Sequence, residues 1–226
     1  MTMNKTEALV DTCFLHKFSK EGKNPDLLKK ILENLDFYPV IHPYIWKYEL
    51  EMSPYVEDLK KAGMLRVASY DEFIKDEDDR ELYREHFLVL YKGLDEYYKA
   101  TNSKKHVEKL PDRCDIFKYR KAKSSIGDVH VVLMASYANI PVVFSNDGDI
   151  PALKSIAKRK IDSEAYQLFI YDALEALEQI VKLPDCFFTK KDIENILNEI
   201  GERPQRSKFK KLWDTYHGQR IEIKTT

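Results

Sequence analysis

Acidic residues follow two apolar segments that lie far apart in this chain, and their placement suggests metal chemistry. Asp11 comes directly after residues 7–10, and the run Ser-Asn-Asp-Gly-Asp at residues 145–149 follows residues 140–144. Both apolar segments fit buried strands, and ligands of open parallel sheets bind at the carboxyl ends of the strands. Carboxylates gathered at that edge repel one another unless a divalent cation neutralises them. The pattern therefore predicts a metal-dependent site for phosphoryl transfer or nuclease chemistry.

Strand-like and helix-like segments alternate along the chain, which predicts an α/β fold built on a mainly parallel sheet. Short apolar runs predict strands at residues 7–10, 37–41, 64–68, 140–144 and 166–170. Apolar residues at helical spacing, with proline or a capping side chain at several of the starts, predict helices at residues 25–35, 44–51, 53–63, 82–94, 128–138, 151–160, 173–181, 189–200 and 203–216. Such a fold brings the ends of distant strands to one edge of the sheet.

The composition narrows the class of protein. The chain has 226 residues, a formal net charge of −1 and three widely spaced cysteines. Separated cysteines in odd number argue against a disulfide framework or a cysteine zinc site and favour a reducing cytosol. No segment approaches the roughly 18 apolar residues that a membrane span needs, and residues 1–8 lack the apolar core of a signal peptide. We therefore expect a soluble, cytoplasmic protein without a membrane partner, which must bind any nucleic acid through local patches of charge.

Four acidic positions occur in an order that is typical of one family of nucleases. Asp11 follows the first strand, Glu49 lies on a helix after the second, Asp128 opens a later helix, and Asp147 stands two residues after Ser145. This order resembles the PIN-domain nucleases over most of the chain. The resemblance implies a three-layer α/β/α domain in which helices cover both faces of a parallel sheet.

The same resemblance implies how the carboxylates would act. Asp11 and Asp147 would be the primary ligands of Mg²⁺ or Mn²⁺ and would be catalytic. Asp128 and Glu49 would complete the catalytic site or hold a second ion through water, and Asp149 would add a further ligand. Mg²⁺ prefers oxygen ligands and keeps several waters. A pair of such ions ~3.5–4 Å apart can activate an attacking water and stabilise the leaving oxygen.

Several of these positions also have an ordinary structural explanation. Asp128 could simply favour the start of a helix, and residues 146–148 could form only a turn. Ser145, which precedes that turn, would on the resemblance orient a ligand or a water molecule by hydrogen bonding. Asp11 is harder to explain in this way, because a carboxylate beside a buried strand is unfavourable unless it is paired or bound to a metal.

Other assignments of the site are weaker or stay open. Glu51 could replace Glu49 as the ligand, because the surrounding residues do not settle the helix phase. A calcium loop that begins at Asn146 would place Ala157 at its twelfth position, where a glutamate is needed. A haloacid-dehalogenase-type phosphatase needs an acid at the position of Cys13, which we expect to be a small buried residue and not a nucleophile.

We divide the chain into a PIN-like nuclease domain at residues 1–182 and a C-terminal helical extension, packed on it, at residues 183–226. Asp128 comes 79 positions after Glu49, more than a compact member of the family needs. We therefore place a helical insertion at about residues 70–123. The insertion begins with an acidic stretch, Asp71 to Asp79, that we expect to be exposed to solvent.

The insertion ends with a basic stretch that could hold phosphates. The candidates for contact with nucleic acid are Lys118, Arg120, Lys121 and Lys123. Phe117 or Tyr119 could stack on unpaired bases. An ordinary charged helix face would explain the same stretch.

Together these features predict a metal-dependent nuclease that cleaves phosphodiester bonds with an activated water. RNA is favoured over DNA, and single-stranded RNA in particular, because many PIN-domain proteins are ribonucleases. The family includes toxins, so a protein inhibitor or antitoxin is an expected partner. The alternative is a non-catalytic PIN-like module that binds nucleic acid or a protein, but the intact acidic set favours the enzyme. The sequence leaves the oligomeric state open.

Overall fold

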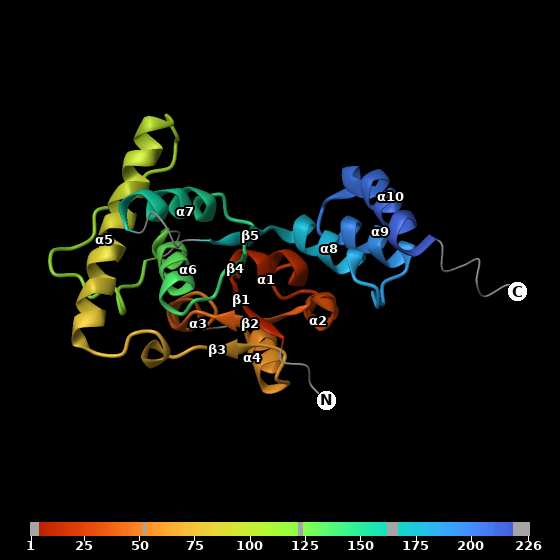
Figure 1. The fold of residues 1–226 in the computed structure, drawn as a ribbon, viewed down its shortest axis with the longest axis horizontal. Coiled ribbons are helices and arrows are strands. Elements are labelled where there is room, and N and C mark those ends of the chain that lie inside the picture. Colours follow the sequence, from red (N-terminus) through yellow and green to blue (C-terminus); the bar gives the residue numbers. More distant parts are fainter. Residues whose placement is uncertain (1–4, 52, 122–123, 162–166, 219–226) are drawn as a thin grey trace, which may run out of the picture.

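A central sheet organises the fold (Figure 1). The computed structural model describes residues 5–51, 53–121, 124–161 and 167–218, and all the strands in these ranges run parallel. The strands are β1 (Thr6–Val10), β2 (Phe37–Ile41), β3 (Arg66–Val67), β4 (Val142–Phe144) and β5 (Phe169–Tyr171). They are ordered β3-β2-β1-β4-β5. The predicted parallel α/β fold is therefore confirmed: the strand expected at residues 37–41 has the predicted bounds, and the other four are found with shifted ends.

The order of the strands places β1 at the centre of the sheet. Leu9 of β1 lies opposite Val40 of β2 on one side and opposite Val143 of β4 on the other. The chain first builds outward from β1 to β3 and then returns to add β4 and β5 on the other side. The order of the strands thus reverses between β1 and β4, and such a point is where open α/β sheets bind their ligands.

Two groups of helices flank the sheet. On the left of Figure 1, α5 (Glu77–Ala100), α6 (Ile126–Tyr137) and α7 (Asp149–Lys160) pack on one another, and α3 (Pro43–Tyr48) packs on α6. Elsewhere α1 (Thr12–Ser19) packs on α2 (Pro25–Asn34), α8 (Ala173–Lys182) contacts α1, and α4 (Pro54–Lys61) precedes β3. This arrangement is consistent with a three-layer α/β/α fold.

Helix α6 lies in the interior, and its sequence explains why. Apolar residues occupy nearly every position from Val129 to Ala135, so the helix is apolar all round and is buried. Asp128 stands in the first turn of this helix, where a negative side chain suits the helix dipole. The burial of α6 therefore fixes where the carboxylate of Asp128 can lie.

Helix α5 belongs to the core even though it falls in the segment that we assigned to an insertion. Tyr83, Phe87, Leu90 and Leu94 are fully buried. A Cβ atom added at Gly93 would lie 2.6 Å from Ile156 Cγ2 of α7, so the glycine lets the two helices approach closely. The assignment of an insertion stays a prediction, but α5 is not a peripheral element.

The prediction that Leu82 belongs to the buried face of α5 is wrong. Leu82 is 44% exposed. The buried stripe runs through Tyr83, Phe87, Leu90 and Leu94 at spacings of four, three and four. Leu82 precedes this stripe by one residue, which on a helix is a turn of about 100° away from the core.

The acidic stretch before α5 is exposed, as expected, but it also makes specific contacts. A short 3₁₀ helix, η1 (Tyr70–Glu72), begins it, and Glu72 pairs with Arg66 at 2.7 Å. Asp76 caps α5 by accepting from the Asp79 amide at 2.8 Å. The stretch thus fixes the start of the helix.

The C-terminal helices form a cluster on the right of Figure 1. It consists of α9 (Lys190–Glu199), the 3₁₀ turn η2 (Arg203–Gln205) and α10 (Arg206–His217), and α10 packs on α8. The single helix predicted at residues 203–216 is therefore split into a turn and a helix. Ion pairs from Lys17 to Glu202 (3.0 Å) and from Lys20 to Glu199 (3.4 Å) join the cluster to α1 and its C-cap. None of the described helices is both long and apolar enough to cross a membrane.

Candidate metal centre

Three of the predicted ligands meet at the carboxyl edge of the sheet. Asp147 lies in the turn after β4, Asp149 begins α7, and Asp128 lies in the first turn of α6. Each offers an oxygen atom, and these three oxygens lie within 4.8 Å of one another. Such a group could hold a metal ion. We call these three residues the aspartate cluster.

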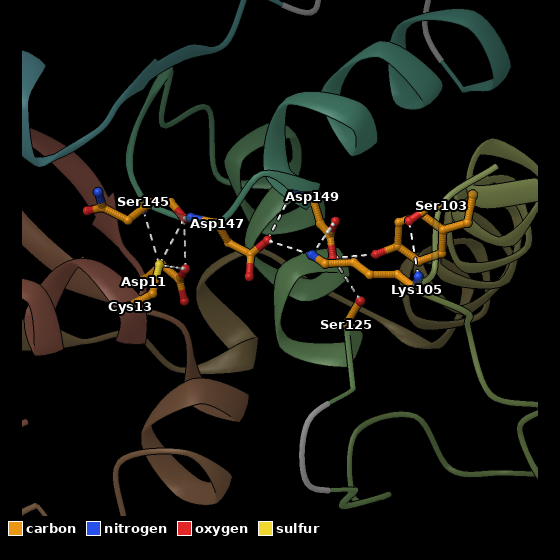
Figure 2. A network of polar contacts seen from close by, with 10 residues as sticks. Asp11, Cys13, Ser103, Lys105, Ser125, Ser145, Asp147 and Asp149 are labelled. Atoms are coloured by element: carbon orange, nitrogen blue, oxygen red, sulfur yellow. Dashed lines mark hydrogen bonds and ion pairs between the residues drawn. The ribbon is translucent and has the colours of Figure 1, made fainter. Parts of the chain in front are cut away.

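Asp11 lies beside the aspartate cluster and is linked to it by Ser145 (Figure 2). The Asp11 side chain caps α1 by accepting from the Thr12 amide at 2.6 Å. Its other oxygen accepts from Ser145 Oγ and from Cys13 Sγ, both at 2.8 Å. Ser145 Oγ in turn accepts from the Asp147 amide at 3.0 Å. The predicted orienting role of Ser145 therefore has a concrete form, in which the serine holds the Asp11 carboxylate and the turn that carries Asp147.

The structure brings Glu49, and not Glu51, to this site. Helix α3 ends at Tyr48, so Glu49 is its C-cap, and Glu49 Oε2 accepts from Thr12 Oγ1 at 2.6 Å. Glu51 instead forms an exposed ion pair with Arg120 at 3.2 Å. The end of α3 at Tyr48 thus decides between Glu49 and Glu51, the choice that the sequence left open.

The carboxylate of Glu49 is packed although the residue as a whole is exposed. A Cβ atom added at Gly127, at the start of α6, would lie well inside van der Waals contact with Glu49 Oε1. Burial of this end of the side chain, with the charges of Asp11 and Asp147 beside it, raises the pKa of Glu49 to about 7. The carboxylate group of Glu49 therefore lies in a crowded place from which water is largely excluded.

The surroundings of Asp128 and Asp11 disfavour the ionised forms of both side chains. Burial, together with the charges of Asp11 and Asp147, raises the pKa of Asp128 well above its usual range. Burial also raises the pKa of Asp11, although its three hydrogen bonds partly oppose the shift. Among the described residues no hydrogen bond or ion pair reaches the Asp128 carboxylate. A bound cation would relieve this repulsion.

A pH titration should detect the raised pKa of Glu49. A carboxyl group with a raised folded-state pKa stabilises the fold fully below its unfolded pKa, and that contribution is lost as the pH rises through the folded pKa. Without divalent cations, the variant Glu49→Gln should therefore become more stable relative to the wild type as the pH rises from about 5 to about 8, since Glu49 has a folded pKa of about 7.

Urea denaturation of both proteins across this range measures the difference in free energy of unfolding. The comparison with the wild type is needed because His42 and His130 are buried and their pKa values are lowered by burial. These two histidines make the absolute stability of both proteins increase as the pH rises, which is opposite to the effect of Glu49. A difference that stays constant with pH would show that Glu49 ionises as it does in the unfolded chain.

Asp149 is held by three residues from outside the predicted site, and Figure 2 labels two of them, Ser125 and Lys105. One of its oxygens accepts from the Tyr98 hydroxyl of α5 and from Ser125 Oγ at 3.2 Å. The other accepts from Lys105 Nζ at 3.0 Å. The turn expected at residues 146–148 also exists, because the Asp149 amide donates to Asp147 Oδ1 at 2.8 Å. The turn and the aspartate cluster are therefore built from the same residues.

The basic residues proposed for contact with nucleic acid do not join the site. Lys118 pairs with Asp115 at 3.4 Å, Arg120 pairs with Glu51, and Lys121 pairs with Glu108. Lys123 lies outside the described residues. These exposed pairs favour the ordinary explanation of a charged surface, which was the alternative to a phosphate-binding role.

The aromatic residues of the basic stretch serve the core. The Phe117 ring is only 7% exposed and stacks on Tyr83 with 5.6 Å between ring centroids. The proposal that Phe117 stacks on bases is therefore wrong, because its faces are already covered. Tyr119 is half-buried, and its carbonyl accepts from the Tyr44 hydroxyl at 2.8 Å.

Cys13 is less buried than expected and takes part in the hydrogen bonds of the site. Its half-buried thiol donates to Asp11, and burial beside that carboxylate raises the pKa of the thiol. A thiol held in its neutral form is a poor nucleophile.

The donor set of the site consists of carboxylate oxygens, which suit a hard divalent cation such as Mg²⁺, Mn²⁺ or Ca²⁺. Cations that need sulfur or imidazole ligands find none among the members of the aspartate cluster. Comparison with models of protein families, with curated proteins and with solved structures gives no match to this chain.

Proposed function

We propose that the protein is a divalent-metal-dependent nuclease that hydrolyses phosphodiester bonds, with single-stranded RNA as the favoured substrate. The observation that carries this proposal is the convergence of Asp128, Asp147 and Asp149 within 4.8 Å at the carboxyl edge of a parallel sheet. The edge lies at the reversal of the strand order, where ligands of such sheets bind. Asp11 and Glu49 add two further carboxylates beside this group.

The residues of the site have separate roles in this proposal. Asp128, Asp147 and Asp149 would hold Mg²⁺ or Mn²⁺, which when bound acts as a Lewis acid on a phosphodiester and its attacking water. Ser145 fixes the position of the Asp11 carboxylate. Glu49, with a pKa of about 7, can take up or release a proton near neutral pH, as general acid–base catalysis requires.

The resemblance to PIN-domain nucleases supports the choice of substrate. The acidic positions after β1, at the end of α3, at the start of α6 and after β4 follow the order that this resemblance requires. RNA as the substrate, and an inhibitor protein or antitoxin as a partner, are inferred from that resemblance alone. No described residue is assigned to reading the 2′-hydroxyl.

A cleavage assay tests the proposal. Purified protein should cut a labelled single-stranded RNA oligonucleotide when Mn²⁺ or Mg²⁺ is present, because the carboxylates need a cation to act on a phosphodiester. EDTA should abolish the cleavage, and excess Mn²⁺ should restore it. A single-stranded DNA of the same sequence, run in parallel, tests the preference for RNA. Cleavage that persists unchanged in EDTA would refute the metal-dependent mechanism.

A non-catalytic PIN-like binding module is the second candidate. The observation that favours it is the pairing of Lys105 with Asp147 (3.7 Å) and Asp149 (3.0 Å). The positive charge of this lysine can compensate the two carboxylates without a metal ion. Binding of RNA without cleavage, and without stabilisation by Mn²⁺, would favour this candidate.

A further inference from the structure

Lys105 places a positive charge of the protein itself at the aspartate cluster. Its ammonium nitrogen lies 3.0 Å from Asp149 Oδ1 and 3.7 Å from Asp147 Oδ1 (Figure 2). Among the described residues it is the only lysine, arginine or histidine that forms an ion pair with the aspartate cluster, with Asp11 or with Glu49. A site that carries several carboxylates thus receives one positive charge from the chain itself.

The loop after α5 delivers this lysine. Helix α5 ends at Ala100, and Asn102 takes a left-handed backbone conformation with φ of 50°. The Ser103 amide donates to the Tyr98 carbonyl at 2.9 Å, and the Lys105 amide donates to Ser103 Oγ at 3.1 Å. The chain therefore turns back at the end of the helix, and Lys105 Nζ lies 6.0 Å from the centroid of the Tyr98 ring.

Lys105 binds the oxygen of Asp149 that has no other hydrogen-bond partner among the described residues. Asp149 Oδ2 is engaged by the Tyr98 hydroxyl and by Ser125 Oγ. Asp149 Oδ1 is the remaining oxygen, and it accepts from Lys105. A dication bound to the same oxygen would lie next to the ammonium group and repel it. The Lys105 side chain is 56% exposed, so it can swing into solvent without disturbing the core.

We propose that Lys105 is a built-in competitor of the metal ion: its ammonium group holds Asp147 and Asp149 together, and a divalent cation must displace it to bind. This inference rests on the proposed function, because it assumes that the aspartate cluster is a metal site. The lysine lowers the affinity of the site for the cation and stabilises the fold when divalent cations are scarce. Activity would then respond to the concentration of the metal.

Titration of the protein with Mn²⁺ alone, without nucleic acid, tests this proposal. Lys105→Met keeps most of the apolar stem and removes the charge, so it should bind Mn²⁺ about three- to tenfold more tightly than the wild type in isothermal titration calorimetry. In EDTA the same variant should melt about 2–4 °C lower, because the aspartates lose their counter-charge. If Lys105 only supported the structure, its replacement would lower the melting temperature without raising the affinity for Mn²⁺.

Two matched variants serve as controls. Lys104→Met removes a charge from the exposed neighbour, which forms no ion pair among the described residues, and it should behave like the wild type. Lys105→Arg keeps the charge and should retain the weaker affinity. An Mn²⁺ affinity of Lys105→Met that equals or falls below that of the wild type would overturn the proposal.

The outcomes separate this inference from the proposed function. A wild type that binds Mn²⁺ but leaves RNA intact, together with tighter binding by Lys105→Met, supports the competition and rejects the nuclease. A wild type that cuts RNA, with no gain in affinity in Lys105→Met, rejects the competition alone. If neither protein binds Mn²⁺, both proposals fail.

Discussion

Replacing Asp128 with asparagine is expected to abolish cleavage and, without divalent cations, to make the protein more stable. The amide has nearly the shape of the carboxylate, but it carries no charge to hold a cation. Loss of this ligand should lower the rate of RNA cleavage at least about a hundredfold. In EDTA at pH 8 the free energy of unfolding should rise, because the substitution removes a charge that burial and the neighbouring carboxylates disfavour.

The gain in stability follows from the surroundings of Asp128. Burial and the charges of Asp11 and Asp147 disfavour its ionised form, and among the described residues no hydrogen bond is lost on substitution. A carboxylate in the first turn of a helix is worth about 0.3–1 kcal/mol, which reduces the gain without reversing it. A residue kept at a cost in stability is typical of a functional site.

Urea denaturation in EDTA and in Mn²⁺, together with the cleavage assay, checks this prediction. Mn²⁺ should stabilise the wild type and leave Asp128→Asn nearly unchanged. The matched control is Asp36→Asn, which replaces an exposed aspartate outside the site and should alter neither property. A variant that loses stability in EDTA and cuts RNA at the rate of the wild type would show that Asp128 is only a helix-start residue.

Gly127→Ala is expected to damage both the fold and the site. The added Cβ atom would lie 2.6 Å from Ile45 Cδ1 and still closer to Glu49 Oε1. To relieve these contacts the Glu49 carboxylate must move from its place beside Thr12, and the fully buried Ile45 side chain must change its conformation. Overpacking of this kind costs about 1–3 kcal/mol, which outweighs the gain of about 1 kcal/mol that alanine brings over glycine inside a helix.

The natural control for this variant is Gly148→Ala. Gly148 has φ of −67°, which alanine adopts easily, and a Cβ atom added there meets nothing within 4 Å. Its free energy of unfolding should equal or slightly exceed that of the wild type. Thermal melting of the two variants, with RNA cleavage by Gly127→Ala, measures the effects. Equal stability of Gly127→Ala and the wild type would mean that Glu49 is not packed against α6.

The elements that carry the aspartates were predictable because their signals are local. A buried strand needs only a short apolar run, and a helix start needs a cap or a proline, as with Asn24 and Pro25 of α2. Asp11 directly follows such a run and Asp147 comes three residues after another, so their presence at one edge of the sheet follows from the parallel topology. That acidic residues would gather at this edge could therefore be expected before their geometry was known.

The partners of these carboxylates could not be inferred in that way. Tyr98 and Lys105 reach Asp149 across 51 and 44 positions of the chain, and their contacts depend on how α5 packs on α7. Phe117 was misplaced for the same reason: its basic neighbours suggested a surface, but its ring fills a space beside Tyr83. Patterns of charge describe where a segment is solvated, and they do not describe which single side chain turns inward.

The chain thus encodes locally which residues can act as ligands, since strand, turn and helix signals extend over a few positions. Whether Glu49 or Glu51 faces the aspartates, and which cation already lies beside them, depends on packing between segments that are distant in the chain. One residue of difference in the end of α3 turns a side chain by about 100°, and a lysine can pair with any carboxylate within reach of its flexible stem. Such choices are settled when the helices close on the sheet.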